Sequence, residues 1–141
     1  MAKNNTKLKV PSTGVGRRVV APQSGGTGSS ENDHPAFCFQ HMRDGYCLSN
    51  CELKEKAALA ETMHELSKLT WAQIHGTHRH GKGCERIDQT SIKGDSVPHY
   101  ITDDVNLLAF RFFGKAPMVG FRTGRIFHIV WLDRNFTLYK H

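Results

Sequence analysis

The chain has 141 residues, of which 38% are hydrophobic, so it has room for one domain around one core. Its formal net charge is +6 when its nine histidines are counted as neutral, which favours a polyanionic partner; the alternative is a solvated basic surface. No window approaches the ~18 apolar residues of a membrane span, and the start of the chain lacks the apolar core of a secretory signal, so we expect a cytoplasmic protein without a membrane partner.

Residues 1–34 have the composition of a tail. They are rich in Gly, Pro and Ser, show no periodic apolar face, and carry five basic residues against two acids. We therefore expect a disordered basic tail over residues 1–34, followed by a single folded domain over residues 35–141. The domain begins with a short strand or turn anchored by Phe37 and Phe39.

Two helices are predicted near the start of the domain. Ser49 and Glu52 have the spacing of a capping box, which opens a helix that ends near Lys68. Thr70 and Gln73 repeat this spacing at the start of a short second helix. The first helix is expected to bury the apolar residues that recur every three or four positions, which are Leu53, Ala57, Ala60, Met63 and Leu66.

A polar, Gly-interrupted stretch links the helices to the rest of the chain over residues 75–104. A weak strand is expected within it, near Pro98–Ile101. Cations on such a loop can follow a phosphate backbone, which makes them candidate substrate-binding residues; the alternative is a flexible polar loop without a ligand. The candidates are His78, Arg79, His80 and Lys82.

Residues 106–141 predict a small antiparallel sheet. Apolar, β-branched and aromatic runs are separated by Gly, Lys-Ala-Pro and Asp-Arg-Asn, and a short strand is expected over residues 136–141. The run over residues 126–132 has large apolar groups on both faces, so it is expected to be central, with helices covering one face. The 106–141 stretch also holds six basic residues against one acid.

This sheet carries the side chains that RNA cleavage requires. Attack by the 2′-OH of RNA needs a base near that hydroxyl, positive charge on the phosphate, and an acid for the leaving 5′-oxygen. Arginine pairs with two phosphate oxygens, and histidine or tyrosine can transfer protons. The catalytic candidates are Arg111, Arg122, Arg125, His128, Tyr139 and His141, with Lys115, Arg134 and Lys140 as further substrate-binding candidates. The alternative places His128 in the core and leaves the arginines as exposed edge charges.

A zinc knuckle is a second candidate site. Cys38, His41, Cys47 and Cys51 are soft ligands close together in the sequence, and their spacings are permissible for tetrahedral zinc. Buried free thiols are the alternative. We expect no cofactor for the RNA-cleaving site.

The chain resembles the RelE/ParE toxin superfamily. The residues that carry the resemblance are FRFF at 110–113, GFRTGRIFHIVWLDRN at 120–135 and LYKH at 138–141. The resemblance implies a RelE-like α+β fold, with a helical hairpin packed on a curved sheet, and a toxin that acts as a metal-independent endoribonuclease on RNA, including mRNA on the ribosome. It also implies that Arg111 and Arg122 or Arg125 hold the phosphate, that Tyr139 or His141 transfers protons, and that an antitoxin protein is a partner.

Two other functions remain open from the sequence. A basic tail and a basic sheet are sufficient for a non-enzymatic nucleic-acid- or protein-binding accessory module of a phage or mobile element. The superfamily also contains toxins that act on gyrase and lack nuclease activity, so the fold alone does not decide the function.

Overall fold

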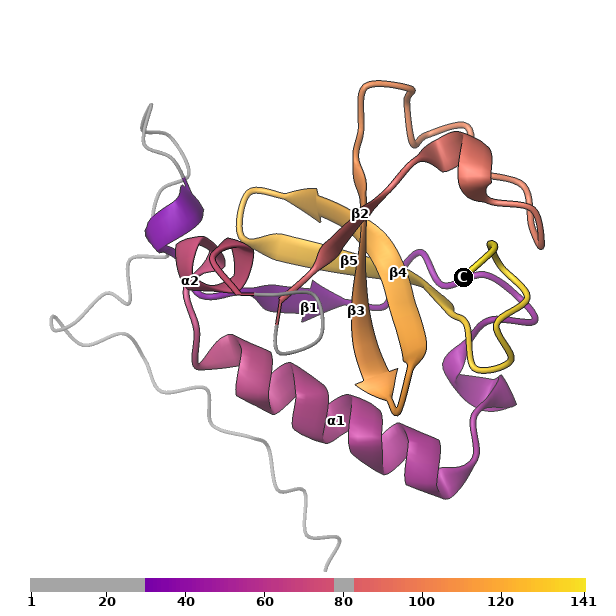
Figure 1. Cartoon of the computed structure of the whole chain (residues 1–141), viewed down its shortest axis with the longest axis horizontal. Coiled ribbons are helices and arrows are strands. Elements are labelled where there is room, and N and C mark those ends of the chain that lie inside the picture. Colours follow the sequence, from indigo (N-terminus) through magenta and orange to yellow (C-terminus); the bar gives the residue numbers. More distant parts are fainter. Residues whose placement is uncertain (1–29, 78–82) are drawn as a thin grey trace, which may run out of the picture.

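A five-stranded mixed sheet with one long helix across it forms an α+β domain (Figure 1). The computed structural model describes residues 30–77 and 83–141, and no helix within them is long and apolar enough to cross a membrane. The strand order is β1-β5-β4-β3-β2. The elements are η1 (Ser30–Asn32), β1 (Ala36–Cys38), η2 (Leu48–Asn50), α1 (Leu53–Ser67), α2 (Trp71–His75), β2 (Glu85–Ile87), η3 (Gln89–Ser91), β3 (Leu107–Phe113), β4 (Ala116–Thr123) and β5 (Ile126–Leu132).

The predicted antiparallel strands are present. β3 pairs with β4 and β4 with β5, through turns in which Gly114 and Gly124 have φ of 56° and 58°, a conformation that favours glycine. β5 is an interior strand as predicted, because β1 pairs with its other edge in parallel. The strand expected over residues 136–141 is not formed; that segment is irregular and is held by hydrogen bonds to Asp133.

The helix α1 ends where the sequence predicted, but its start and its buried face differ. Its N-cap is Glu52, which forms a capping box with Glu55, whereas Ser49 lies in η2. The predicted apolar stripe is wrong at three of its positions, since Leu53, Ala57 and Ala60 are exposed. The buried residues of α1 are Glu55, Leu59 and Leu66.

The second helix forms as predicted. The Thr70 hydroxyl accepts from the Gln73 amide, and the Gln73 side chain accepts from the Thr70 amide. These two bonds satisfy donors that a helix start leaves unpaired. The helix buries Trp71 and Ile74. Just before β1, the 3-10 turn η1 contacts α2.

Two apolar clusters lie on the two sides of the sheet. On the side covered by α1 and α2, which we call the helix face, the core includes Leu66, Trp71, Phe110, Phe127 and Leu132. On the other side, the open face, residues of the segment 87–105 and Leu138 pack against β3, β4 and β5. The weak strand expected near Pro98–Ile101 is absent from this segment, which follows β2 and contains η3.

A close approach of backbones fixes β4 against β5. A Cβ added at Gly120 would lie 1.8 Å from the carbonyl oxygen of His128. The register shifts at this point, between Val119 and Gly120. Any larger side chain here would push the two strands apart.

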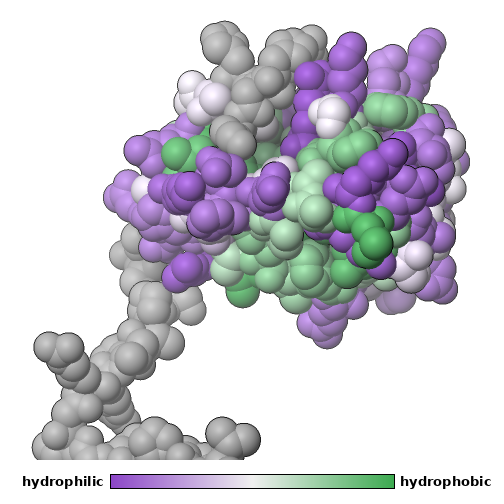
Figure 2. All heavy atoms as spheres, turned by 90° about the horizontal axis from the view of Figure 1, so that it is seen from below, coloured by the Kyte–Doolittle hydropathy of each residue, from purple (hydrophilic) through white to green (hydrophobic). Residues whose placement is uncertain are grey.

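An apolar area lies on the surface seen from below Figure 1, the side of α1 (Figure 2). Leu53 at the start of α1 is 84% exposed, and Phe113 at the end of β3 is 37% exposed. The Lys54 ammonium lies 5.9 Å from the centre of the Phe113 ring, which places the start of α1 beside the end of β3.

Candidate active site

Three of the predicted catalytic residues lie near one another on the open face. Tyr139 and His141 have ring centres 4.1 Å apart, and His141 Nε2 lies 3.1 Å from Asp133 Oδ2. Arg111, exposed on β3, is close enough to Tyr139 to act on its phenol electrostatically. This group of Arg111, Asp133, Tyr139 and His141 is the candidate active site.

Asp133 holds the segment that carries the two rings. Its side chain is fully buried, and it accepts hydrogen bonds from the Thr137 amide at 2.8 Å and the Leu138 amide at 3.2 Å. An ionised carboxylate with several donors is a strong and directional anchor. Because Asp133 directly follows β5, these hydrogen bonds hold residues 137 and 138 next to the end of that strand.

Leu138 and its carbonyl group fix the same segment from the other side. The Leu138 side chain is fully buried in the core of the open face, and its carbonyl oxygen accepts from the amides of Lys93 and Gly94. A Cβ on Gly94 would lie 2.4 Å from the Thr137 carbonyl oxygen, so only glycine allows this approach. Tyr139 and His141 are therefore supported by a rigid backbone.

Tyr139 keeps its proton over the physiological pH range. Burial raises the pKa of its phenol to about 12, with the charges of Glu85 and Asp133 adding to the effect and Arg111 opposing it. A neutral phenol donates a hydrogen bond and can act as an acid, but it is a poor base at neutral pH.

His141 is oriented for proton transfer. When its Nε2–H donates to Asp133, its Nδ1 carries a lone pair and can accept a proton. The side chain of His141 is partly exposed while that of Asp133 is not, so the imidazole connects a buried carboxylate to the surface. Together with the Arg111 guanidinium, this arrangement contains one group that can accept a proton, one that can donate a proton, and a cation that can pair with an anion.

The prediction that Arg122 joins this group is wrong. Arg122 lies on the helix face, with its guanidinium 4.2 Å from the centre of the Trp71 ring. Its Nη1 donates to Glu31 at 2.6 Å, its Nη2 to Ser30 at 2.7 Å, and its Nε to the Gly124 carbonyl. These contacts attach η1 to the sheet, so the arginine is committed to structure and faces away from Arg111.

His128 and Arg125 also lie apart from the group. His128 is on the open face, but it pairs with Phe121, whereas Arg111 pairs with Pro117, four residues along β4 or about 13 Å. Its ring stacks on Phe121 at 4.6 Å, and its Nε2 lies 2.7 Å from the Thr123 hydroxyl. Burial, followed by the charge of His41, lowers the pKa of His128. Arg125 is exposed in the turn between β4 and β5.

The predicted substrate-binding residues have different positions. Arg134 is paired with the buried Glu55 at 2.7 Å and with Glu52 at 3.6 Å, so its role in holding α1 to β5 corrects the prediction that it binds substrate. Lys115 is exposed in the turn between β3 and β4, and Lys140 is exposed next to Tyr139 in the sequence. His78, Arg79, His80 and Lys82 lie outside the described residues.

The predicted zinc ligands do not converge. Within residues 30–77 and 83–141, no three His, Cys, Asp or Glu side chains are grouped to hold a metal ion. Cys51 is buried in the helix-face core, Cys47 Sγ bonds the Ser49 hydroxyl, and the His41 ring packs on Tyr100. The three side chains are engaged in different environments.

Sequence reasoning missed two features of the site region. The sequence places Asp133 in a turn, and nothing in it marks this acid as buried beneath the residues that follow it. The missed groove beside β2, lined by Arg86 and Asn106, depends on how residues 103–106 return to the sheet. Comparisons of the chain with protein-family models, with curated proteins and with solved structures found no match.

Proposed function

We propose that this protein is a toxin-like endoribonuclease with a RelE-like fold, which cleaves RNA by attack of the 2′-OH on the neighbouring phosphate. The observation that carries the proposal is the imidazole of His141, held by the buried Asp133 beside the protonated phenol of Tyr139. Arg111 supplies positive charge on the same face.

The proposed reaction assigns one task to each side chain. His141 Nδ1 takes the proton of the 2′-OH, and the 2′-oxygen forms a bond to phosphorus. The bond from phosphorus to the 5′-oxygen breaks, and Tyr139 gives its proton to that oxygen. Arg111 pairs with the phosphate oxygens, whose negative charge increases in the transition state. The products are a 2′,3′-cyclic phosphate and a 5′-OH, and the proton on His141 then returns to Tyr139 through solvent.

The arrangement of the domain supports the RelE-like assignment. A long helix and a short one precede three antiparallel strands, and they pack on one face of the sheet. The proposed catalytic residues are on the other face, where the helices do not block RNA. Lys115 and Lys140 are exposed and add two positive charges to that of Arg111.

By the same resemblance, we propose that an antitoxin protein controls this activity and that mRNA on the ribosome is a substrate. An acidic antitoxin segment that covers Arg111 and Lys140 would exclude RNA from the site. Free RNA is the simpler substrate for a first test.

The test is cleavage of labelled single-stranded RNA by purified full-length protein in the presence of EDTA. We expect His141→Ala to lower the rate by about 10²–10⁴-fold, because it removes the base. Arg111→Ala and Tyr139→Phe should each lower it at least tenfold. Lys56→Ala, which removes a cation on α1, is the matched control and should cleave like the wild type. The proposal fails if the His141, Arg111 and Tyr139 variants all retain wild-type rates, or if no cyclic phosphate is formed.

The runner-up is the non-enzymatic nucleic-acid-binding module. It is supported by Lys115 and Arg125, which are exposed in turns at opposite ends of β4 and could contact phosphates without any catalytic group. RNA binding that weakens with salt, without cleavage by the wild type, would favour this module.

A further inference from the structure

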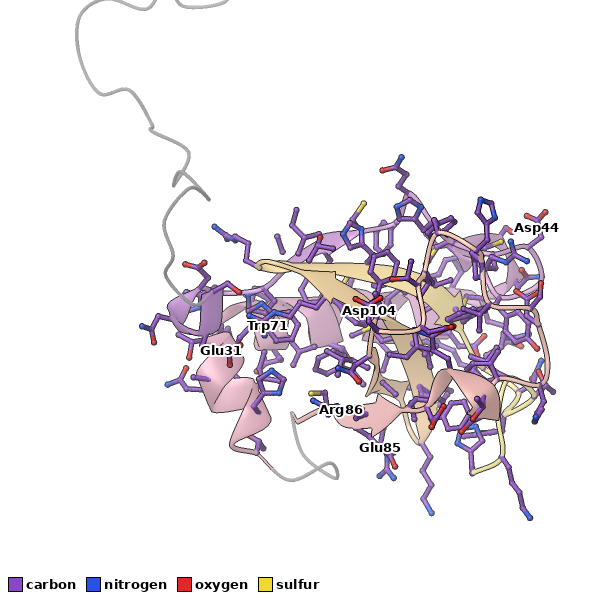
Figure 3. All side chains as sticks on the ribbon, turned by 90° about the horizontal axis from the view of Figure 1, so that it is seen from above. Glu31, Asp44, Trp71, Glu85, Arg86 and Asp104 are labelled. Atoms are coloured by element: carbon purple, nitrogen blue, oxygen red, sulfur yellow. The ribbon has the colours of Figure 1, made fainter. Side chains whose placement is uncertain are left out.

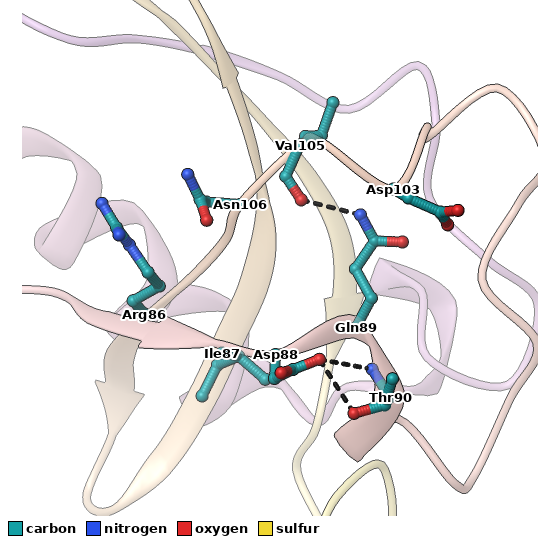
Figure 4. A pocket seen from close by; sticks show the side chains of 8 residues that line it. All are labelled: Arg86, Ile87, Asp88, Gln89, Thr90, Asp103, Val105 and Asn106. Carbon is teal, nitrogen blue, oxygen red and sulfur yellow. Dashed lines mark hydrogen bonds between the residues drawn. The ribbon is translucent and has the colours of Figure 1, made fainter.

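A groove runs beside the edge strand β2, away from the candidate active site. Two cavities of about 530 and 450 Å3 share Arg86, Val105 and Asn106 in their walls, so they lie side by side along this edge, and we call them together the groove. Figure 4 shows Arg86 and Asn106 projecting on the same side from neighbouring segments. The groove is large enough for a nucleoside, and none of the residues of the candidate active site lines it.

The walls of the groove are held in place. Gln89 Nε2 donates to the carbonyls of Thr102 at 2.8 Å and Val105 at 2.7 Å, which ties the segment after β2 to the segment before β3 (Figure 4). Asp88 caps η3 by accepting from the Thr90 amide. Since β2 pairs with β3 opposite Leu107 to Ala109, the groove is built on the sheet itself.

The far end of the groove is closed by a rigid polar cluster. Glu31, His75 and Arg122 line it, and Figure 3 shows Glu31 and Trp71 beside α2. Glu31 neutralises Arg122, and His75 Nε2 lies 3.3 Å from Arg122 Nη1. This end therefore presents a fixed wall, without a surplus of positive charge for a phosphate.

Free hydrogen-bonding groups lie between the two ends. Arg86 and Asn106 are exposed, and within the described part of the chain neither side chain has a hydrogen bond or ion pair. Asp104 accepts from the Thr102 hydroxyl through one oxygen, which leaves the other available. The groove thus offers the paired donors of a guanidinium, one free carboxylate oxygen of Asp104, and the remaining lone pair of the oxygen that Thr102 contacts.

The charge of the groove excludes a phosphate as its main ligand. Four carboxylates line it, those of Glu31, Asp88, Asp103 and Asp104, against the guanidiniums of Arg86 and Arg122. Such a site favours a neutral group that has both N–H donors and acceptors. Guanine has two adjacent acceptors, O6 and N7, which match an arginine, and two adjacent donors, N1–H and N2–H2, which match a carboxylate.

We propose that this groove binds a guanine base of the RNA substrate, with Arg86 on the O6 and N7 edge, Asp104 on the N1 and N2 edge, and Asn106 as a further amide contact. The proposal rests on the proposed RNA-cleaving function. Glu85 acts on Tyr139 at the active site, and its neighbour Arg86 points to the other side of β2. The guanine would therefore belong to a nucleotide that crosses the edge strand next to the cleaved phosphate.

The experiment is a titration of the full-length protein with the four nucleoside 5′-monophosphates, followed by calorimetry or NMR. We expect GMP to bind roughly tenfold more tightly than AMP, CMP or UMP, as a bidentate base contact provides. Arg86→Ala and Asp104→Asn should each reduce GMP affinity to the level of the other three. Both side chains are exposed, so these variants should fold, and Lys56→Ala should leave the preference unchanged.

The outcomes separate this proposal from the proposed function. Equal affinity for all four nucleotides, or a GMP preference that survives Arg86→Ala and Asp104→Asn, would overturn the guanine site even if the protein cleaves RNA. A GMP preference lost in those variants would support the site even if wild-type protein leaves RNA intact.

Discussion

Asp133 and His141 illustrate how burial gives individual side chains their roles. The Asp133 carboxylate is fully buried and accepts hydrogen bonds from backbone amides of the segment that carries His141. It therefore holds the backbone of that segment and also orients the imidazole of His141. Tyr139 is affected by the same enclosure, since burial is the main reason for its raised pKa. Arg122, by contrast, has a purely structural role, because its N–H donors already bond to Glu31, Ser30 and Gly124.

The ionisation of Tyr139 should separate from that of the other tyrosines. We expect its phenol to titrate near pH 12, above the ordinary value of 10.0, because burial penalises the charged form. The measurement is the ultraviolet absorbance of wild type minus Tyr139→Phe from pH 8 to 12.5.

The sign of the linked stability effect follows from the raised pKa. The stabilisation is fully present below pH 10 and is lost as the pH rises towards 12, since only the unfolded chain ionises freely in that range. The wild type should therefore lose more unfolding free energy than Tyr139→Phe between pH 10 and 12. A component near pH 10 in the difference spectrum would contradict the burial of this side chain.

Among the elements, the positions of the strands in the sequence were predicted well, whereas the direction in which individual side chains point from strands and helices was predicted less well. Apolar runs with turn residues between them identify β3, β4 and β5, because half-buried and interior strands have that composition. The prediction that Arg111 and Arg122 lie in one site was wrong because alternate residues of a strand point to opposite faces of the sheet. Arg111 pairs with Pro117, and this register puts Arg111 and Arg122 on different sides. That register depends on the turn and on the irregularity between Arg111 and Phe113, which the sequence does not specify.

The helix α1 was misoriented for a similar reason. Its predicted stripe contained only apolar residues, yet its buried face includes Glu55, whose charge is matched by Arg134 from the end of β5. A hydrophobicity pattern has no means of anticipating an ion pair between segments so far apart in the sequence. The pair also lowers the pKa of Glu55, chiefly through its hydrogen bond with Arg134.

Removing one partner of this pair should weaken the attachment of α1. We expect Arg134→Ala to lower the free energy of unfolding, because it leaves the carboxylate of Glu55 without its cation. The double variant Arg134→Ala with Glu55→Gln should recover part of that loss. The measurement is urea unfolding followed by circular dichroism, with Lys56→Ala, a partly exposed position on α1, as the control. Equal stability of Arg134→Ala and the wild type would show that the pair is not a structural link.

At the scale of the whole molecule, charge and shape divide the surface into regions of different chemistry. The net charge of +6 favours RNA in general, while the groove beside β2 has more acids than arginines in its walls and the side of α1 carries exposed apolar groups. A strand of RNA would therefore be drawn to the cations of the open face. Affinity from phosphates and selectivity from bases should then depend on different residues.

Salt dependence should reveal that division. In a His141→Ala background, where RNA cleavage is expected to be slow, RNA affinity should fall as salt rises. Adding Arg111→Ala should reduce the slope of log K against log salt by about 0.7, the value for one phosphate contact on a single strand. Adding Arg86→Ala should change the slope less than Arg111→Ala does, since Arg86 is proposed to contact a base. The measurement is fluorescence anisotropy from 50 to 300 mM KCl. An unchanged slope for the Arg111 variant would argue against a phosphate contact there.

The parallel pairing of β1 with β5 has a consequence for synthesis on the ribosome. The three residues Ala36–Cys38 acquire their strand partner only when Ile126–His128 has left the exit tunnel, after the helices and the other strands. Until then, the nascent chain exposes the apolar side of α2 and the unpaired edge of the early segment, which is the type of surface that chaperones recognise. The five-stranded sheet can therefore be completed only after β5, the last of its strands in the sequence, has emerged from the ribosome.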